Sequence, residues 1–166
     1  MKIVRIISGG QTGSDRAGLE AAIAAGIKYS GTVPLGRRAE DGKVPEKYVG
    51  MVESDQWSYL PRTEANVANS DATVVLCHGA PQRGSKRTLT FAAKHRKPYL
   101  AVNLNLPMEK CLEKVVKWLK EIPLDSGTLN VAGSRESISP GIQKEVTELM
   151  IEVVRKANEE ETSLFD

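Results

Sequence analysis

The sequence contains few of the residues that hold metals or form disulfides. Its 166 residues include two cysteines and two histidines. Cys77 and Cys111 do not form a C-x-x-C pair, and the histidines add no chelating spacing, so we expect no metal site built from protein side chains. Two isolated thiols also give no disulfide framework, which favours a reducing, cytoplasmic compartment.

Long hydrophobic runs and an excess of one charge are also missing. No apolar stretch approaches about 18 residues and no signal-peptide pattern opens the chain, so we expect neither a membrane span nor export. The formal net charge is +2 and aromatic residues make up 5%. Because no stripe of Lys and Arg with interleaved aromatics occurs, we expect no nucleic-acid partner.

Apolar segments alternate with helical patterns along the chain. Residues 3–7, 72–77, 99–104 and 129–132 have the β-branched or apolar character of buried strands, and helical patterns follow each of them. This alternation predicts an α/β fold with a mainly parallel sheet covered on both faces. We expect one domain over residues 1–157 and a frayed acidic tail over residues 158–166.

The clearest candidate ligand loop lies in residues 3–26, IVRIISGGQTGSDRAGLEAAIAAG. An apolar strand passes through Gly9, Gly10 and Gly13 into an alanine-rich helix, and these glycines allow positive φ and close approach of a ligand to the backbone. The motif is neither a P-loop nor the dinucleotide fingerprint. We interpret it as an anion site at a helix N-terminus, with a plain structural turn as the alternative.

The start of this first helix carries a capping pattern. Thr12 and Asp15 have the T-x-x-D spacing in which a hydroxyl caps the first turn and a carboxylate reaches back to it. Ser14 is the alternative N-cap. Either arrangement points free amides toward the mouth of the strand.

Two further segments carry polar candidates. Residues 35–48, LGRRAEDGKVPEKY, form a long loop with Arg37, Arg38 and Glu40. The arginines either fold over an anion bound at the first loop or belong to a solvated, self-paired surface loop. Arg62, Thr63 and Asn66 share a face of a predicted helix over residues 61–70, where a capping or surface role is the alternative.

Polar residues also follow two later strands. His78 follows residues 72–77 and is either a general base or a hydrogen-bonded structural residue. Ser134 and Arg135 follow the last strand. A second helix start carries cations and hydroxyls, from Gly84, Ser85, Lys86, Arg87 and Thr88. Ligands of parallel sheets bind beyond the carboxyl ends of the strands, so we expect these loops to converge on one site.

Four segments together resemble the family named "putative molybdenum cofactor carrier proteins". They read GGQTGSDRAGLEAA, GRRAEDGKVP, RTEANVANSDATVVL and NVAGSRES, the last followed by PGI. This family is similar to the Rossmann-like group of lysine decarboxylase-like proteins, cytokinin-activating phosphoribohydrolases and the DNA-processing protein DprA. The resemblance implies a Rossmann-like three-layer sandwich, a nucleotide or pterin-phosphate pocket, and a homo-oligomer.

The resemblance also implies a set of ligand-binding residues. Carried over by position, they are Gly9, Gly10, Thr12, Gly13, Asp15, Arg16, Arg37, Arg38, Arg62, Thr88 and Arg135. The loop pattern adds Gly84, Ser85 and Ser134. The phosphoribohydrolases carry P-G-G-x-G-T-x-x-E, but the loop here reads GSKRTLTFA and lacks the glutamate, so Asp15 and Glu40 are the remaining catalytic candidates.

Three functions are therefore open. We expect first a carrier of a phosphorylated heterocycle, the molybdenum cofactor, held by its phosphate on the Gly9 loop. The second is a nucleotide-processing hydrolase that uses Asp15 or Glu40 with an arginine clamp. The third is a nucleotide-sensing module whose oligomeric state is its output.

Overall fold

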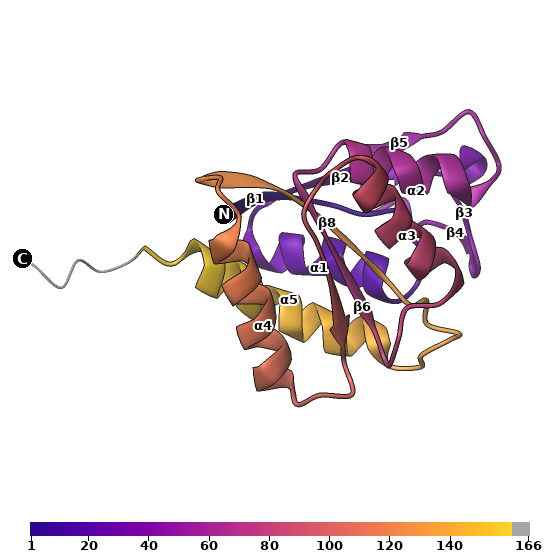
Figure 1. Ribbon diagram of the computed structural model, residues 1–166. Coiled ribbons are helices and arrows are strands. Elements are labelled where there is room, and N and C mark those ends of the chain that lie inside the picture. The colour runs from indigo at the N-terminus through magenta and orange to yellow at the C-terminus, as the bar shows by residue number, and fades with distance from the viewer. Residues whose placement is uncertain (161–166) are drawn as a thin grey trace, which may run out of the picture.

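The computed structural model describes residues 1–160, and a six-stranded sheet forms its centre (Figure 1). The strand order is β5-β2-β1-β8-β6-β7, and every pairing within this sheet is parallel. The strands are β1 Lys2–Ile7, β2 Lys28–Val33, β5 Met51–Glu53, β6 Ala72–Cys77, β7 Tyr99–Asn103 and β8 Ser126–Gly133. A small antiparallel pair, β3 Arg38–Ala39 and β4 Gly42–Lys43, lies outside it.

Helices cover both faces of the sheet. They are α1 Ser14–Ala25, α2 Tyr59–Ala68, α3 Arg83–Lys94, α4 Met108–Glu121 and α5 Ile142–Asn158, with a 3-10 turn η1 at Leu35–Arg37. Helices α1, α4 and α5 lie on one face, and α2 and α3 lie on the other (Figure 1). The predicted Rossmann-like three-layer sandwich with a mainly parallel sheet is confirmed.

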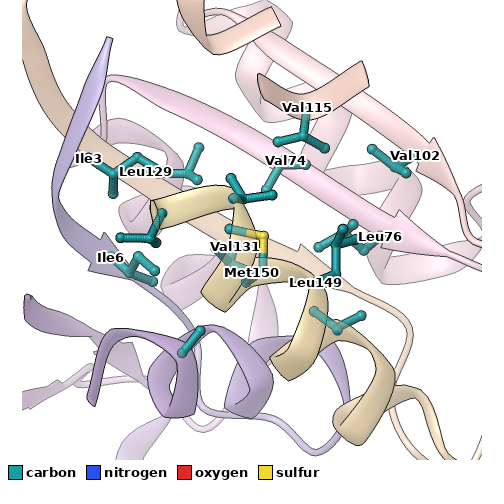
Figure 2. Packing of buried hydrophobic residues seen from close by; sticks show 14 of the residues in the cluster. Ile3, Ile6, Val74, Leu76, Val102, Val115, Leu129, Val131, Leu149 and Met150 are labelled. Carbon is teal, nitrogen blue, oxygen red and sulfur yellow. The ribbon is translucent and has the colours of Figure 1, made fainter. Parts of the chain in front are cut away.

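The main hydrophobic core lies between the sheet and the layer of α1, α4 and α5. Figure 2 shows alternate residues of the central strands packed against Leu149 and Met150 of α5. These strand residues are fully or almost fully buried, as the alternation of side chains along a strand requires. Strand β1 is less covered than its sequence suggests, because Val4 on its other face is 50% exposed.

The opposite face of the sheet is more polar where α2 and α3 cover it. Asn130 alternates with the core residues Leu129 and Val131 along β8, so its side chain lies on the side of α2 and α3. Asn130 is 2% exposed and its Nδ2 atom donates to Thr73 Oγ1 of β6 at 3.3 Å. Asn130 and Ala132 both line a cavity on this side, so the site described below extends under α2 and α3.

The two ends of the described chain meet at the amino edge of the sheet. The side-chain amide of Asn158, the last residue of α5, accepts from the Ile3 N–H at 2.7 Å and donates to the Ile3 carbonyl at 2.9 Å. Of the predicted tail over residues 158–166, residues 161–166 lie outside the described part of the chain. No helix within residues 1–160 is long and apolar enough to cross a membrane.

Candidate functional site

A cavity of about 1150 Å³ opens at the carboxyl edge of the sheet. The loops after β1, β6 and β8 contribute to its wall, as do α2 and the first turns of α3. This is the place where open parallel sheets bind ligands, and the volume is large enough for a ligand of several rings. The predicted convergence of the three loops therefore corresponds to a real hollow.

Nine of the predicted site residues line this cavity. They are Gly9, Asp15, Arg38, Arg62, Gly84, Ser85, Thr88, Ser134 and Arg135. His78, Thr63, Asn66 and Arg87, which the sequence also suggested, line it too. Six predicted residues do not line it, namely Gly10, Thr12, Gly13, Arg16, Arg37 and Glu40. The predicted set therefore contains residues that line the cavity and residues that lie outside its wall.

Amides of the glycine-rich loop already have partners within the protein. The Gln11 N–H donates to Asp15 Oδ2 at 3.2 Å, and the Thr12 N–H donates to Gln11 Oε1 at 3.1 Å. The Ser14 N–H donates to the Ser134 carbonyl at 3.1 Å. The carboxylate of Asp15 thus lies where the sequence suggested that an external anion would lie.

The predicted capping of α1 by a hydroxyl is wrong. Gly13 is the N-cap and no side chain hydrogen bonds there. The Thr12 hydroxyl instead donates to Glu40 and accepts the Glu136 N–H at 3.1 Å. The Ser14 hydroxyl donates to the Leu76 carbonyl at 3.1 Å. Both hydroxyls serve long-range contacts that the local pattern does not reveal.

A buried ion pair lies on the floor of the cavity. Arg62 Nη1 is 3.1 Å from Asp15 Oδ2, and the two side chains are 11% and 7% exposed. Burial raises the pKa of Asp15 above its ordinary value, although Arg62 and the Gln11 N–H act to lower it. A Cβ atom on Gly9 would lie 1.6 Å from Arg62 Nη1, so glycine at this position makes room for the guanidinium.

Glu40, the other catalytic candidate, lies outside the cavity wall. It accepts from the Ser137 hydroxyl at 2.5 Å and from the Ser137 N–H at 3.2 Å, and Arg135 Nη1 is 3.7 Å away. Burial raises the pKa of Glu40, but the hydrogen bonds from Ser137 and Thr12 outweigh it and the pKa lies below its ordinary value. Glu40 therefore joins the β3–β4 hairpin to the loop after β8 as a stable anion.

Arg16 and Arg37 hold the long loop in place. Arg16 makes two hydrogen bonds with the Asp41 carboxylate, at 2.5 and 2.7 Å, and its Nε donates to the Gly10 carbonyl at 3.0 Å. Arg37 donates to three carbonyls, those of Val44, Pro45 and Tyr48, at 3.0, 2.8 and 3.1 Å. Both guanidinium groups therefore make most of their hydrogen bonds to acceptors of this loop and its neighbours.

The remaining glycines of the first loop face the protein as well. A Cβ on Gly10 would meet Val44 at 2.8 Å, and a Cβ on Gly13 would meet the Ser134 carbonyl oxygen at 2.4 Å. These glycines permit close packing of the loop against its neighbours. Of the three, Gly9 alone lines the cavity.

Three arginines converge on one aromatic ring at the cavity. The guanidinium carbons of Arg38, Arg62 and Arg135 lie 4.3, 5.4 and 5.6 Å from the centroid of the Tyr59 ring. Arg38 also lies 5.0 Å from the centroid of the Trp57 ring. Such cation–π contacts hold charges close to one another on an aromatic surface. The sequence pattern did not suggest Tyr59 or Trp57, because neither lies in a glycine-rich loop.

The start of α3 forms another part of the wall. Its N-cap, Gln82, makes no side-chain capping bond. Thr88 Oγ1 donates to the Gly84 carbonyl at 3.0 Å. Ser85 is 9% exposed and lines the cavity, and its hydroxyl makes no hydrogen bond with the described residues. A helix N-terminus with an available hydroxyl is suited to an anionic group.

The cavity is strongly positive. Arg38, Arg62, Arg83, Arg87 and Arg135 line it, and Asp15 is the one carboxylate among the described residues of the wall. His78 at the rim is held by Glu145 of α5, with Nε2 2.9 Å from Oε2. No group of three or more His, Cys, Asp or Glu residues within residues 1–160 could hold a metal ion. The site therefore favours an anion over a cation.

The fold and this cavity define a Rossmann-like α/β protein whose site lies at the carboxyl edge of its sheet. Residues 6–154 match the model of the circularly permutated YpsA SLOG family, and the chain belongs to that family. It is also similar to a solved structure, a "Putative molybdenum carrier protein" from Syntrophus aciditrophicus SB at 1.45 Å resolution. The two share 40% identity over 92% of this chain and 94% of the other, with a TM-score of 0.85.

The predicted resemblance to the molybdenum carrier proteins is therefore confirmed. No functionally curated protein matches the chain.

Proposed function

We propose that this chain binds a phosphorylated heterocyclic ligand in the cavity and carries it, and that the ligand is the molybdenum cofactor. The observation that carries this proposal is the wall of a cavity of about 1150 Å³, where the described residues supply five arginines and one carboxylate. A pterin with a phosphate group is anionic and of suitable size. The name of the similar protein from Syntrophus aciditrophicus, a molybdenum carrier, supports the same choice.

We place the phosphate at the start of α3 and not on the Gly9 loop. Amides of the Gly9 loop already donate to Asp15, Gln11 and Ser134. The start of α3 offers the Ser85 hydroxyl, the helix N-terminus and the nearby Arg87. Molybdenum is then cargo that arrives on its own organic cofactor. Cytoplasmic location and a homo-oligomer remain predictions.

Native mass spectrometry of freshly purified protein tests the proposal first. We expect an added mass that matches a phosphorylated heterocycle. In parallel, calorimetry with GMP should show binding that Arg87→Ala weakens roughly tenfold, because a charge-assisted hydrogen bond is lost. Arg155→Ala on the far side of α5, in surface ion pairs, is the matched control and should leave the affinity unchanged. A chain with no retained mass and no affinity for GMP would contradict the proposal.

One observation favours a second candidate, a nucleotide-processing hydrolase. Asp15 lines the cavity and its raised pKa suits a group that exchanges protons with a substrate. Incubation with a panel of nucleotides, followed by chromatography for free base and phosphate, distinguishes the two functions. Turnover that disappears in Asp15→Asn would favour the hydrolase, whereas binding without turnover favours the carrier.

Arg37→Ala should affect stability and not ligand affinity. Arg37 donates to three loop carbonyls and does not line the cavity. We expect the free energy of unfolding to fall by about 2 kcal/mol in urea titration, since several charge-assisted hydrogen bonds are lost. Affinity for GMP should stay within error, whereas Arg87→Ala at the start of α3 should lower it. Unchanged stability with a lower affinity for GMP would instead assign Arg37 to ligand binding, as the sequence suggested.

A further inference from the structure

The arginines of the cavity fall into two groups that come from different elements. Arg83 and Arg87 belong to α3. Arg38 of β3, Arg62 of α2 and Arg135 after β8 form the other group, which we call the Tyr59 cluster because their guanidinium carbons lie within 5.6 Å of its ring centroid. The folding of three distant segments is needed to bring these charges together.

The carboxylates near the Tyr59 cluster leave positive charge uncompensated. Arg62 pairs with Asp15 at 3.1 Å, and the nearest carboxylate oxygen to Arg135 is that of Glu40 at 3.7 Å. Within residues 1–160, Arg38 forms no ion pair, and its Nη1 donates to the Trp57 carbonyl at 3.3 Å. Three guanidinium groups beside two carboxylates leave one positive charge without a counter-charge among the described residues, and a further anion would stabilise the cluster.

Two buried donors beside the cluster also have no acceptor within residues 1–160. They are Arg62 Nε and Gln11 Nε2, and both residues line the cavity. The orientation of the Gln11 amide is fixed, because its Oε1 accepts the N–H groups of Thr12 and Glu40 at 3.1 and 2.9 Å. If the amide were flipped, its NH2 group would face the N–H groups of Thr12 and Glu40, and neither could accept a hydrogen bond. Because a buried donor without a partner is costly, an acceptor belongs next to these two atoms.

We propose that the Tyr59 cluster and Gln11 form a second oxyanion subsite, separate from the start of α3. The ligand then carries two anionic groups, one at each subsite, with its ring system between them. The class of group at the Tyr59 cluster is a tetrahedral oxyanion with several acceptor oxygens, such as a second phosphate or a metal oxyanion. This inference depends on the proposed function, because it takes the cavity to be the ligand site.

Calorimetry with two nucleotides at a fixed ionic strength of about 0.15 M tests the subsite. We expect adenosine 3′,5′-bisphosphate to bind at least roughly tenfold more tightly than AMP. Arg38→Ala should remove most of that gain and change AMP affinity by less than about threefold. Arg87→Ala should weaken both nucleotides. Arg155→Ala, remote from the cavity, is the control for the lost charge.

A second titration distinguishes the two sources of oxyanion. Inorganic phosphate and inorganic molybdate are each added to protein saturated with AMP, and both should bind to the wild type and not to Arg38→Ala. Tighter binding of molybdate would assign the subsite to a metal oxyanion, and tighter binding of phosphate to a second phosphate.

The failures of the two proposals differ. If AMP binds but the bisphosphate gains nothing, or if Arg38→Ala weakens both nucleotides equally, the second subsite is refuted and the proposed function stands. If the wild type binds neither nucleotide and neither oxyanion, the proposed function fails and the subsite fails with it.

Discussion

Arg62→Ala should lower the free energy of unfolding by about 3 kcal/mol, because it leaves the buried Asp15 carboxylate without its cation. The pair lies 3.1 Å apart and both side chains are nearly excluded from water. The variant should also weaken binding of adenosine 3′,5′-bisphosphate, since one arginine of the Tyr59 cluster is lost. Urea unfolding and calorimetry measure the two effects independently.

A second substitution shows how much of the lost stability is due to the unpaired charge of Asp15. Asp15→Asn combined with Arg62→Ala removes both charges, so the double variant should recover much of the lost stability without recovering affinity. Arg155→Ala, whose ion pairs with Glu152 and Glu159 are exposed, should unfold like the wild type. A loss in Arg62→Ala as small as that in Arg155→Ala would contradict the importance of the buried pair.

Gly133→Ala should destabilise the fold by about 3 kcal/mol or more, through combined backbone strain and overpacking. Gly133 ends β8 at the cavity with φ at +152°, and a Cβ atom there would lie 1.9 Å from the Leu76 carbonyl oxygen. Leu76 belongs to the neighbouring central strand β6, so the atom that would have to move is sheet backbone. We expect a lower midpoint in urea and a low yield of soluble protein.

Gly26→Ala is the matched control for the clash. Gly26 also has positive φ, at +69°, but a Cβ atom there meets nothing within 4 Å. Its cost should be about 1 kcal/mol, the cost of the left-handed conformation alone. The excess loss in Gly133→Ala therefore reports the contact with Leu76 together with the different strain of its φ angle. Equal losses would show that the strands can separate to accept the methyl group.

The element types could be predicted from the sequence, but the strand order could not. Apolar runs such as residues 72–77 and 129–132 have the composition of buried parallel strands, and they form β6 and part of β8. The last strand, β8, lies between β1 and β6. A hydrophobic pattern tells which face of a strand is buried, whereas strand order depends on which crossovers pack best over the whole sheet.

The meeting of the loops at one cavity could be predicted from the sequence. The loops after three strands meet because parallel strands end on the same edge. The roles of single arginines could not be predicted, since the acceptors of Arg16 and Arg37 are Asp41 and the carbonyls of Val44, Pro45 and Tyr48. Tyr59 could not be recognised as a site residue from the sequence, because the three arginines around its ring come from distant segments of the chain.

The hydrogen-bonded contact between Asn158 and Ile3 makes the described chain nearly a closed ring. Its beginning and its last helix meet at the edge of the sheet opposite the cavity, so a short linker could connect them without approaching the ligand. New ends could then be opened in a loop away from the cavity, such as the one at Gly50, where added atoms meet nothing within 4 Å. The segments could therefore follow one another in a different order along the chain and still form the same cavity.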